Sequence, residues 1–185
     1  MKARLILGVL LMTIDVLCKP AAANPQAACT DASAAKVEQE LRASLDLSAR
    51  IEAGRAAGRD VSAWEAERRI SDDEVLPPCL ERAVDLVRDT DAKLGDIIFD
   101  VAVAQQNLAD ERTSWSLGRL FGYRTDIVSE QLKRFDGRVR NQLISGIYFG
   151  WLNVRDDFPT EIQVARDAAI LALAKQYDVI LITAR

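Results

Sequence analysis

Apolar residues recur every seven positions along one stretch of this chain, and no other feature restricts its fold as strongly. The series is Leu80, Val87, Leu94, Val101, Leu108 and Trp115. A strict heptad over this length predicts a long helix, about 79–116, that packs along its side in coiled-coil fashion. A second line alternates apolar with polar residues, and its members are Val84, Asp91, Ile98, Gln105 and Arg112. Because the polar residues weaken this seam, the pattern favours an intramolecular helical hairpin over a dimeric coiled coil.

Helical periodicity also covers most of the remaining chain. The other predicted helices lie at about 31–57, 62–70, 125–153 and 160–177. Ser71 to Glu74, followed by Pro77-Pro78, predict a break just before the heptad segment. The whole pattern predicts an all-α fold, an elongated helical bundle that forms a single domain over 24–185.

The two ends of the mature chain carry weaker signals. Residues 24–30 are predicted to form a short extended arm. In the last helix, the residues predicted to face the core are Ile162, Ala165, Ala169, Ala172 and Leu173. Residues 179–183 are rich in β-branched side chains, which favours a short strand, although no partner strand is evident.

Residues 1–23 have the three parts of a secretory signal peptide. Two basic residues open the segment, residues 5–17 are largely apolar, and Ala21-Ala22-Ala23 is an A-x-A cleavage site. A retained membrane anchor is disfavoured, because about 20 apolar residues are needed to span a bilayer. Lipidation at Cys18 is disfavoured as well, since the small residues that should precede a lipidated cysteine are missing. We therefore predict export to the periplasm and no transmembrane segment in the mature chain.

Two cysteines, Cys29 and Cys79, remain after removal of the signal peptide. In an oxidising compartment two cysteines are more often paired than free. Neither belongs to a C-x-x-C motif, so a redox or metal role is disfavoured. We predict a structural disulfide between them, which the chain-entropy model values at about 4 kcal/mol for a loop of this size.

Composition argues against several classes of function. Residues 1–23 carry three basic side chains and one acidic one, so their removal changes the formal net charge from −4 to −6. An acidic chain without a basic block has no electrostatic reason to bind nucleic acid. The sequence contains no histidine, the commonest general base and zinc ligand, and no phosphate- or dinucleotide-binding motif. We predict no catalytic, cofactor-binding or metal-binding residues, and a protein that is not an enzyme.

Carboxylates are the one group that leaves catalysis open. Glu74 and the cluster of Asp156, Asp157 and Glu161 are candidates for acid–base chemistry of the lysozyme type. Loops and helix caps use the same residue types, and that interpretation is preferred for both.

Aromatic and large apolar residues gather in two segments that also contain paired glycines. The members are Trp115, Leu120, Phe121 and Tyr123 in the first segment, and Tyr148, Phe149 and Trp151 in the second. Core packing is the preferred interpretation, and a surface for a protein partner is the alternative. The pairs Gly118/Gly122 and Gly146/Gly150 are both G-x-x-x-G. Charged and polar neighbours argue against a membrane span, so these pairs predict tightly packed helices or hinges.

Several short motifs are spread over nearly the whole chain. They are Asp15-Val16-Leu17-Cys18, Glu67 to Asp72, Leu76 to Leu80, Tyr123 to Asp126, Gly150 to Asn153, Asp156 to Thr160 and Thr183-Ala184-Arg185. Together they resemble the TraH family of rhizobial and agrobacterial plasmid conjugation systems. The resemblance implies a role in conjugal plasmid transfer, and it brings no catalytic residues with it.

Export and this resemblance together predict an accessory or scaffold component of the mating-pair or type IV secretion apparatus. Its partners are then proteins of the cell envelope. Two alternatives stay open, an enzyme acting on peptidoglycan and a general envelope chaperone. The sequence also leaves open whether the chain forms a homo-oligomer.

Overall fold

The computed structural model describes residues 27–181, apart from 90 and 106–110. All regular secondary structure within this part of the chain is helical, which confirms the predicted all-α class. The elements are α1 (Ala27–Thr30), α2 (Ala34–Ala56), α3 (Ser62–Ile70), a π-helical turn (Ser71–Val75), α4 (Leu76–Asp89), α5 (Ala92–Ala104), α6 (Glu111–Tyr123), α7 (Thr125–Leu132), α8 (Gly137–Val154), a 3-10 turn (Arg155–Asp157) and α9 (Thr160–Gln176). The predicted signal peptide at 1–23 lies outside the described residues.

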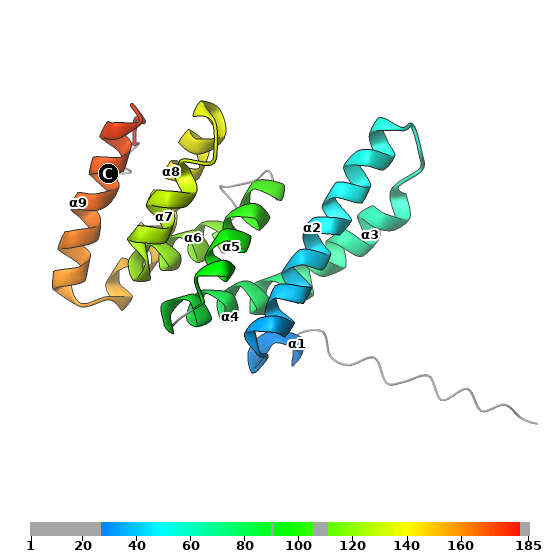
Figure 1. The fold of residues 1–185 in the computed structure, drawn as a ribbon, viewed down its shortest axis with the longest axis horizontal. Helices are drawn as coiled ribbons and strands as arrows, with labels where there is room; N and C mark the ends of the chain where they lie inside the picture. Colours follow the sequence, from blue (N-terminus) through cyan, green and yellow to red (C-terminus); the bar gives the residue numbers. More distant parts are fainter. Residues whose placement is uncertain (1–26, 90, 106–110, 182–185) are drawn as a thin grey trace, which may run out of the picture.

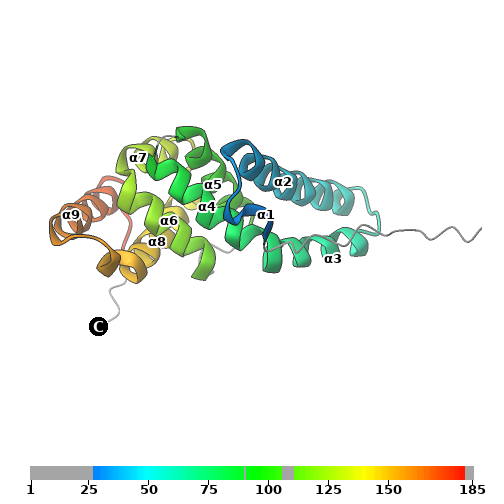
Figure 2. The ribbon, with the colours of Figure 1, turned by 90° about the horizontal axis from the view of Figure 1, so that it is seen from below.

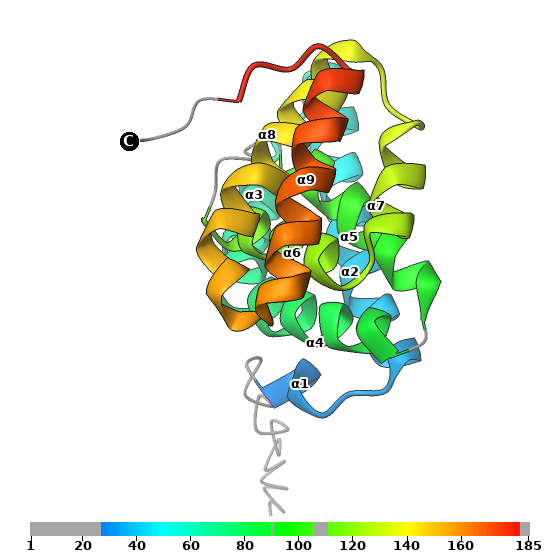
Figure 3. The ribbon, with the colours of Figure 1, turned by 90° about the vertical axis from the view of Figure 1, so that its left-hand side faces the viewer.

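The helices are arranged along one long axis. Helices α2 and α3 form an antiparallel hairpin at one end, α4 to α8 lie in the middle, and α9 lies at the other end (Figures 1 and 2). Helix α9 contacts α6, α7 and α8. The view from this end shows α9 as the outermost helix in front of those three (Figure 3).

The single long helix predicted over 79–116 is wrong, because this stretch forms α4, α5 and α6. The described boundaries of α5 fall on polar residues of the second heptad line. Asp91 is the N-cap of α5, where its carboxylate accepts a hydrogen bond from the Lys93 backbone N–H at 3.1 Å, and Gln105 is the C-cap. An aspartate side chain competes for backbone N–H groups and favours a cap over a helix interior.

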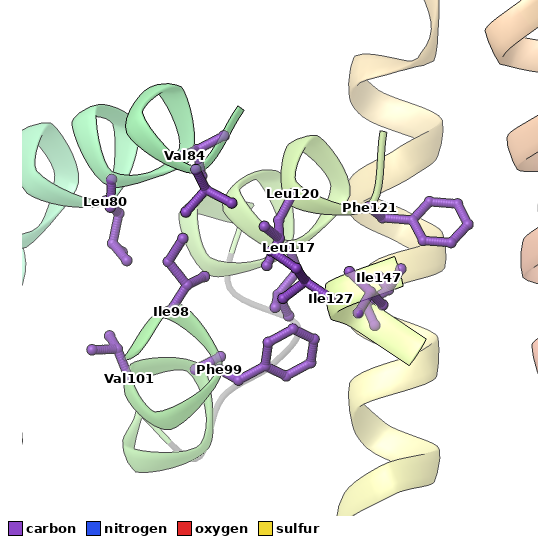
Figure 4. Close-up of a cluster of buried hydrophobic side chains, with 14 of the residues drawn as sticks. Leu80, Val84, Ile98, Phe99, Val101, Leu117, Leu120, Phe121, Ile127 and Ile147 are labelled. Carbon is purple, nitrogen blue, oxygen red and sulfur yellow. The ribbon is translucent and has the colours of Figure 1, made fainter. Parts of the chain in front are cut away.

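Four of the apolar heptad residues nevertheless lie in the core. Leu80, Val87, Leu94 and Val101 are all buried, whereas Leu108 lies outside the described residues. They lie on two separate helices, α4 and α5, instead of along one coiled-coil seam. Figure 4 shows this core, with labelled side chains from five helices: Leu80, Val84, Ile98, Phe99, Val101, Leu117, Leu120, Phe121, Ile127 and Ile147.

The helix predicted over 125–153 is also divided. Helix α7 ends at Leu132 and α8 begins at Gly137, with Asp136 in an extended conformation as the N-cap of α8. Aspartate and glycine together favour a turn over a continuous helix. The apolar periodicity continues on both sides of this turn, so periodicity alone did not reveal it.

The break predicted at Ser71 to Glu74 and Pro77-Pro78 is wrong, because the chain stays helical from α3 into α4. The Leu76 N–H donates to the Ser71 carbonyl, which is the wider bonding pattern of a π-helix. Both prolines then fall in the first turn of α4. Proline lacks a backbone N–H, and here both prolines directly follow the π-helical turn, where the regular α-helical bonding pattern is already interrupted.

The N-terminal arm predicted at 24–30 is partly helical, since residues 27–30 form α1. A disulfide joins Cys29 in α1 to Cys79 in α4, with 4.9 Å between the two Cα atoms, and this confirms the predicted pair. Both cysteines are fully buried. The bond therefore ties the start of the described chain to the central helices.

Helices α6 and α8 cross in very close contact. A Cβ atom built on Gly118 would lie 2.1 Å from the carbonyl carbon of Gly150, and one built on Gly150 would lie 1.6 Å from the carbonyl oxygen of Ser114. No side chain fits between backbones at these distances. Glycines from the two G-x-x-x-G pairs thus meet at one crossing, which confirms the prediction of tight helix packing.

The predicted inward face of α9 is partly wrong. Leu173 is buried as predicted, but Ala165 and Ala172 are exposed, and the buried side includes Ile170 and Ala174 instead. A helix that is apolar around most of its circumference gives no unique inward face from periodicity.

The tail forms no strand between Val179 and Leu181, and residues 182–185 lie outside the described part. The Val179 N–H donates to the Ala174 carbonyl at 2.8 Å, with Asp178 at a φ of +54°. This is a Schellman cap of α9, and it bends the chain back at the helix end.

Candidate protein-interaction site

The structure places most of the predicted aromatic segments in the core. Leu120, Phe121 and Trp151 are fully buried, and Tyr148 is nearly so. The Phe121 and Trp151 rings meet edge to face, with 6.0 Å between their centroids. These four residues therefore fill the interior, as the preferred interpretation predicted, and offer no surface to a partner in this conformation.

The other three residues of the predicted partner surface reach solvent. Phe149 on α8 is 42% exposed, while Trp115 and Tyr123 on α6 are half-buried. The Tyr123 ring packs against Phe158, with 5.0 Å between the centroids. These three residues are thus surface positions, and Trp115 lines a groove.

That groove lies between α4 and α6 and has a volume of about 380 Å³. Its lining residues are Pro77, Leu80, Glu81, Glu111, Arg112, Trp115 and Ser116. On each helix these residues lie within about one turn of one another, so each helix presents them on one side. The groove combines apolar side chains with two carboxylates and a guanidinium, and its Trp115 and Arg112 are residue types that are enriched at protein interfaces.

Trp115 is held in place from one side. The Arg119 guanidinium lies over the Trp115 ring, 4.9 Å from its centroid, and pairs with Asp157 at 2.9 Å. A cation–π contact and an ion pair on one arginine restrict both side chains. The indole therefore forms a preorganised wall of the groove.

The π-helical turn helps to fix the position of α6 relative to α4. Within this turn the Asp72 carboxylate accepts a hydrogen bond from the Gln105 amide at 3.0 Å and pairs with Arg68 at 3.4 Å. The Asp72 carbonyl accepts a longer bond from Arg112 at 3.5 Å. A groove residue on α6 is thus linked directly to the segment that precedes α4.

The carboxylates singled out from the sequence do not lie in this groove. Glu74 belongs to the π-helical turn, Asp157 pairs with Arg119, Asp156 pairs with Arg155 at 3.7 Å, and Glu161 lies in the first turn of α9. The groove instead contains Glu81 and Glu111, which sequence reasoning missed. They are thirty residues apart, and no local pattern links them.

A second polar cluster surrounds Asp167 on α9. Its carboxylate accepts hydrogen bonds from Trp151 Nε1 at 2.8 Å and from the Arg155 guanidinium at 2.8 to 3.1 Å. The bonds from Arg155, followed by the bond from Trp151, hold the pKa of Asp167 below its ordinary value. This cluster attaches α9 to α8 and satisfies the indole N–H of a buried tryptophan.

The depressed pKa of Asp167 gives a pH-dependent contribution to stability. Stabilisation by this carboxylate is complete above the pKa of the unfolded chain, about 3.9, and is lost as the pH falls from there towards the lower pKa of the folded state. Asp167→Asn keeps an oxygen acceptor for Trp151 but cannot ionise. On lowering the pH from 7 to 3, we expect this variant to lose about 1 kcal/mol less unfolding free energy than the unaltered protein loses. Urea unfolding at both pH values measures this.

Asp156→Asn is the matched control for that experiment, because the Asp156 side chain is 96% exposed and pairs only loosely with Arg155. Its pH dependence should equal that of the unaltered protein. If the Asp167→Asn variant also showed the pH dependence of the unaltered protein, the pH-dependent contribution assigned to Asp167 would be contradicted.

The part of the chain that the structure describes offers neither a cluster of metal ligands nor a membrane-spanning helix. Its described residues contain no group of three or more Asp, Glu, Cys or His side chains positioned to hold a metal ion. None of the described helices combines the length and the apolar character needed to cross a bilayer.

Relatives were sought in three ways. Comparisons with protein-family models, with curated proteins and with solved structures found no match. The resemblance to the TraH family therefore stays a prediction that rests on the short motifs.

Proposed function

We propose that this protein is a helical scaffold of the bacterial cell envelope that assists conjugal plasmid transfer by holding a segment of an envelope protein in the α4–α6 groove. The observation that carries the proposal is the make-up of that groove. Leu80 and Trp115 give it apolar walls, and Glu81, Glu111 and Arg112 add charges of both signs. A partner segment with one apolar face and flanking charges complements such a surface.

Two further observations support the compartment and the process. The buried Cys29–Cys79 disulfide suits an oxidising compartment outside the cytoplasm. The short motifs that resemble the TraH family support a role in plasmid transfer. The groove supports a binding role in that process, because its walls offer a preorganised aromatic ring and a guanidinium, two groups enriched at interfaces.

The frequency of plasmid transfer from a donor strain tests this proposal. A donor with a clean deletion of the gene is complemented with the full-length gene, with a copy lacking residues 1–23, or with groove variants. We expect the deletion to lower transfer and only the exported copy to restore it. The groove variants are Trp115→Ala and the double change Glu81→Lys with Glu111→Lys, and neither should restore transfer.

The matched control is Asp46→Lys with Glu67→Lys, which makes the same change in net charge at exposed positions on α2 and α3. This control should restore transfer, and the folding of every variant is verified by circular dichroism. Unchanged transfer from the deletion strain would refute the role in conjugation. Full restoration by both groove variants would refute the groove as the binding site.

A further inference from the structure

Helix α9 is apolar on both sides, although only one side is covered. Ile170, Leu173 and Ala174 are buried against the rest of the molecule. On the opposite side Val164 is 62% exposed and Leu171 is 59% exposed. Their exposed neighbours on this side include three alanines, at 165, 168 and 172. A surface helix normally carries polar residues on its outer side, so an apolar outer side indicates a partner surface.

The position of α9 leaves this outer side free. The helix contacts α6, α7 and α8, and these three lie behind it when the molecule is viewed from its α9 end (Figure 3). No other described helix lies over α9 in that view. Helix α1, at the start of the described chain, lies beside α4 and away from α9 (Figure 1).

The outer side of α9 is symmetric about Ala168. Its exposed members, in order, are Glu161, Val164, Ala165, Ala168, Leu171, Ala172 and Lys175. Glu161 lies seven residues before Ala168 and Lys175 lies seven residues after it. Neither of these charged side chains forms an ion pair within the described part of the chain. A second copy of α9 running in the opposite direction would place each glutamate beside a lysine.

The apolar residues are complementary in the same arrangement. Val164 and Leu171 lie on one side of the line through residues 161, 168 and 175, and Ala165 and Ala172 lie on the other side. With Ala168 at the two-fold axis, Val164 meets Leu171 of the second copy, and Ala165 meets Ala172 of the second copy. The larger apolar residues thus bury one another on one side of the interface, and the alanines let the two helices approach closely on the other. A self-complementary patch of this kind is the requirement for an isologous dimer.

We propose that the outer side of α9 is a self-association surface, on which α9 of a second copy packs antiparallel to form a two-fold symmetric dimer. The chemistry favours a protein over a membrane surface, because this side carries a single basic residue, Lys175, whereas interfacial helices are rich in lysine and arginine. The dimer does not depend on the proposed role in plasmid transfer.

Sedimentation velocity of the purified exported protein over a range of concentrations tests the surface. We expect a concentration-dependent dimer that Leu171→Glu weakens at least about tenfold. Ile70→Glu on α3 is the matched control, because Ile70 is 56% exposed and lies away from α9. That variant should dimerise as the unaltered protein does. A monomer at all concentrations, or a dimer that is insensitive to Leu171→Glu, would overturn the proposal.

Charge reversal tests the antiparallel register. Glu161→Lys alone and Lys175→Glu alone each place like charges together, and each should weaken the dimer about tenfold or less. The double variant restores opposite charges and should restore the affinity. Failure of the double variant to recover would overturn this register.

Crosslinking with a short bismaleimide gives an independent measure of direction. Ala168→Cys should crosslink to itself, because residue 168 of each copy lies on the two-fold axis. Gln176→Cys should not, since the two copies of residue 176 would lie about 24 Å apart along the helix axes. Crosslinking at both positions would indicate a parallel pair and overturn the proposal. The proposal would also be overturned if the monomer bound to phosphatidylcholine–phosphatidylglycerol vesicles and Leu171→Glu abolished that binding.

Discussion

Gly150→Ala is expected to lower the free energy of unfolding by about 3 kcal/mol, the upper end for an overpacked site. The added methyl group would lie 1.6 Å from the Ser114 carbonyl oxygen, which is a backbone atom that no rotamer change can move. Helices α6 and α8 must therefore separate along their crossing. The loss of close packing there exceeds the gain of up to about 1 kcal/mol from replacing a helical glycine by alanine.

Gly137→Ala is the matched control on the same helix. An added methyl group at Gly137 would meet no atom within 4 Å, so only the helix preference changes and the variant should be slightly more stable. Urea unfolding followed by circular dichroism measures both variants. Equal stability of the two would show that α6 and α8 do not touch at Gly150.

Gly118→Ala supplies a further check on the same crossing, since its methyl group would lie 2.1 Å from the carbonyl carbon of Gly150. Once one substitution has separated the helices, the second finds more room. The double variant Gly118→Ala with Gly150→Ala should therefore lose less stability than the sum of the two single losses.

Replacing both Cys29 and Cys79 by alanine is expected to lower the free energy of unfolding by about 2–4 kcal/mol. The bond closes a loop with a sequence separation of 50 residues, and it holds the four-residue helix α1 against α4. Without it the unfolded chain gains conformational freedom. A helix as short as α1 has little stability of its own, so we also expect α1 to detach first.

Urea unfolding with and without a reducing agent measures this contribution. The reductant should destabilise the unaltered protein to about the level of the double alanine variant, and it should leave that variant unchanged. Amide hydrogen exchange over residues 27–30 reports the detachment of α1. A double variant as stable as the oxidised protein would contradict a stabilising role for the disulfide.

In the heptad segment, the spacing of apolar residues predicts which residues are buried but not where the helices end. The apolar positions Leu80, Val87 and Leu94 are buried as their spacing predicted. The same spacing did not predict that the chain turns at Asp91, because an aspartate serves both on an exposed helix face and as an N-cap. Choosing between those roles depends on what the next helix packs against.

The candidate site shows the same division. The cluster of aromatic residues around Trp115 identifies it as a candidate for a partner surface. Nothing in the sequence places it beside Leu80 and Glu81 on α4. Phe121 and Trp151 were singled out in the same way and lie in the core. Composition identifies residues that favour interfaces, whereas exposure decides which of them a partner can reach.

The sequence by itself determined the helical class, the apolar residues that are buried in α4 and α5, and the pairing of Cys29 with Cys79. These depend on local spacing and on the number of cysteines, which are properties of the chain. The tertiary structure alone decided where the helices end, that α6 and α8 cross at Gly118 and Gly150, and that the outer side of α9 is uncovered. Those features arise from contacts between segments far apart in the chain, and their free energy depends on packing geometry that no local pattern encodes.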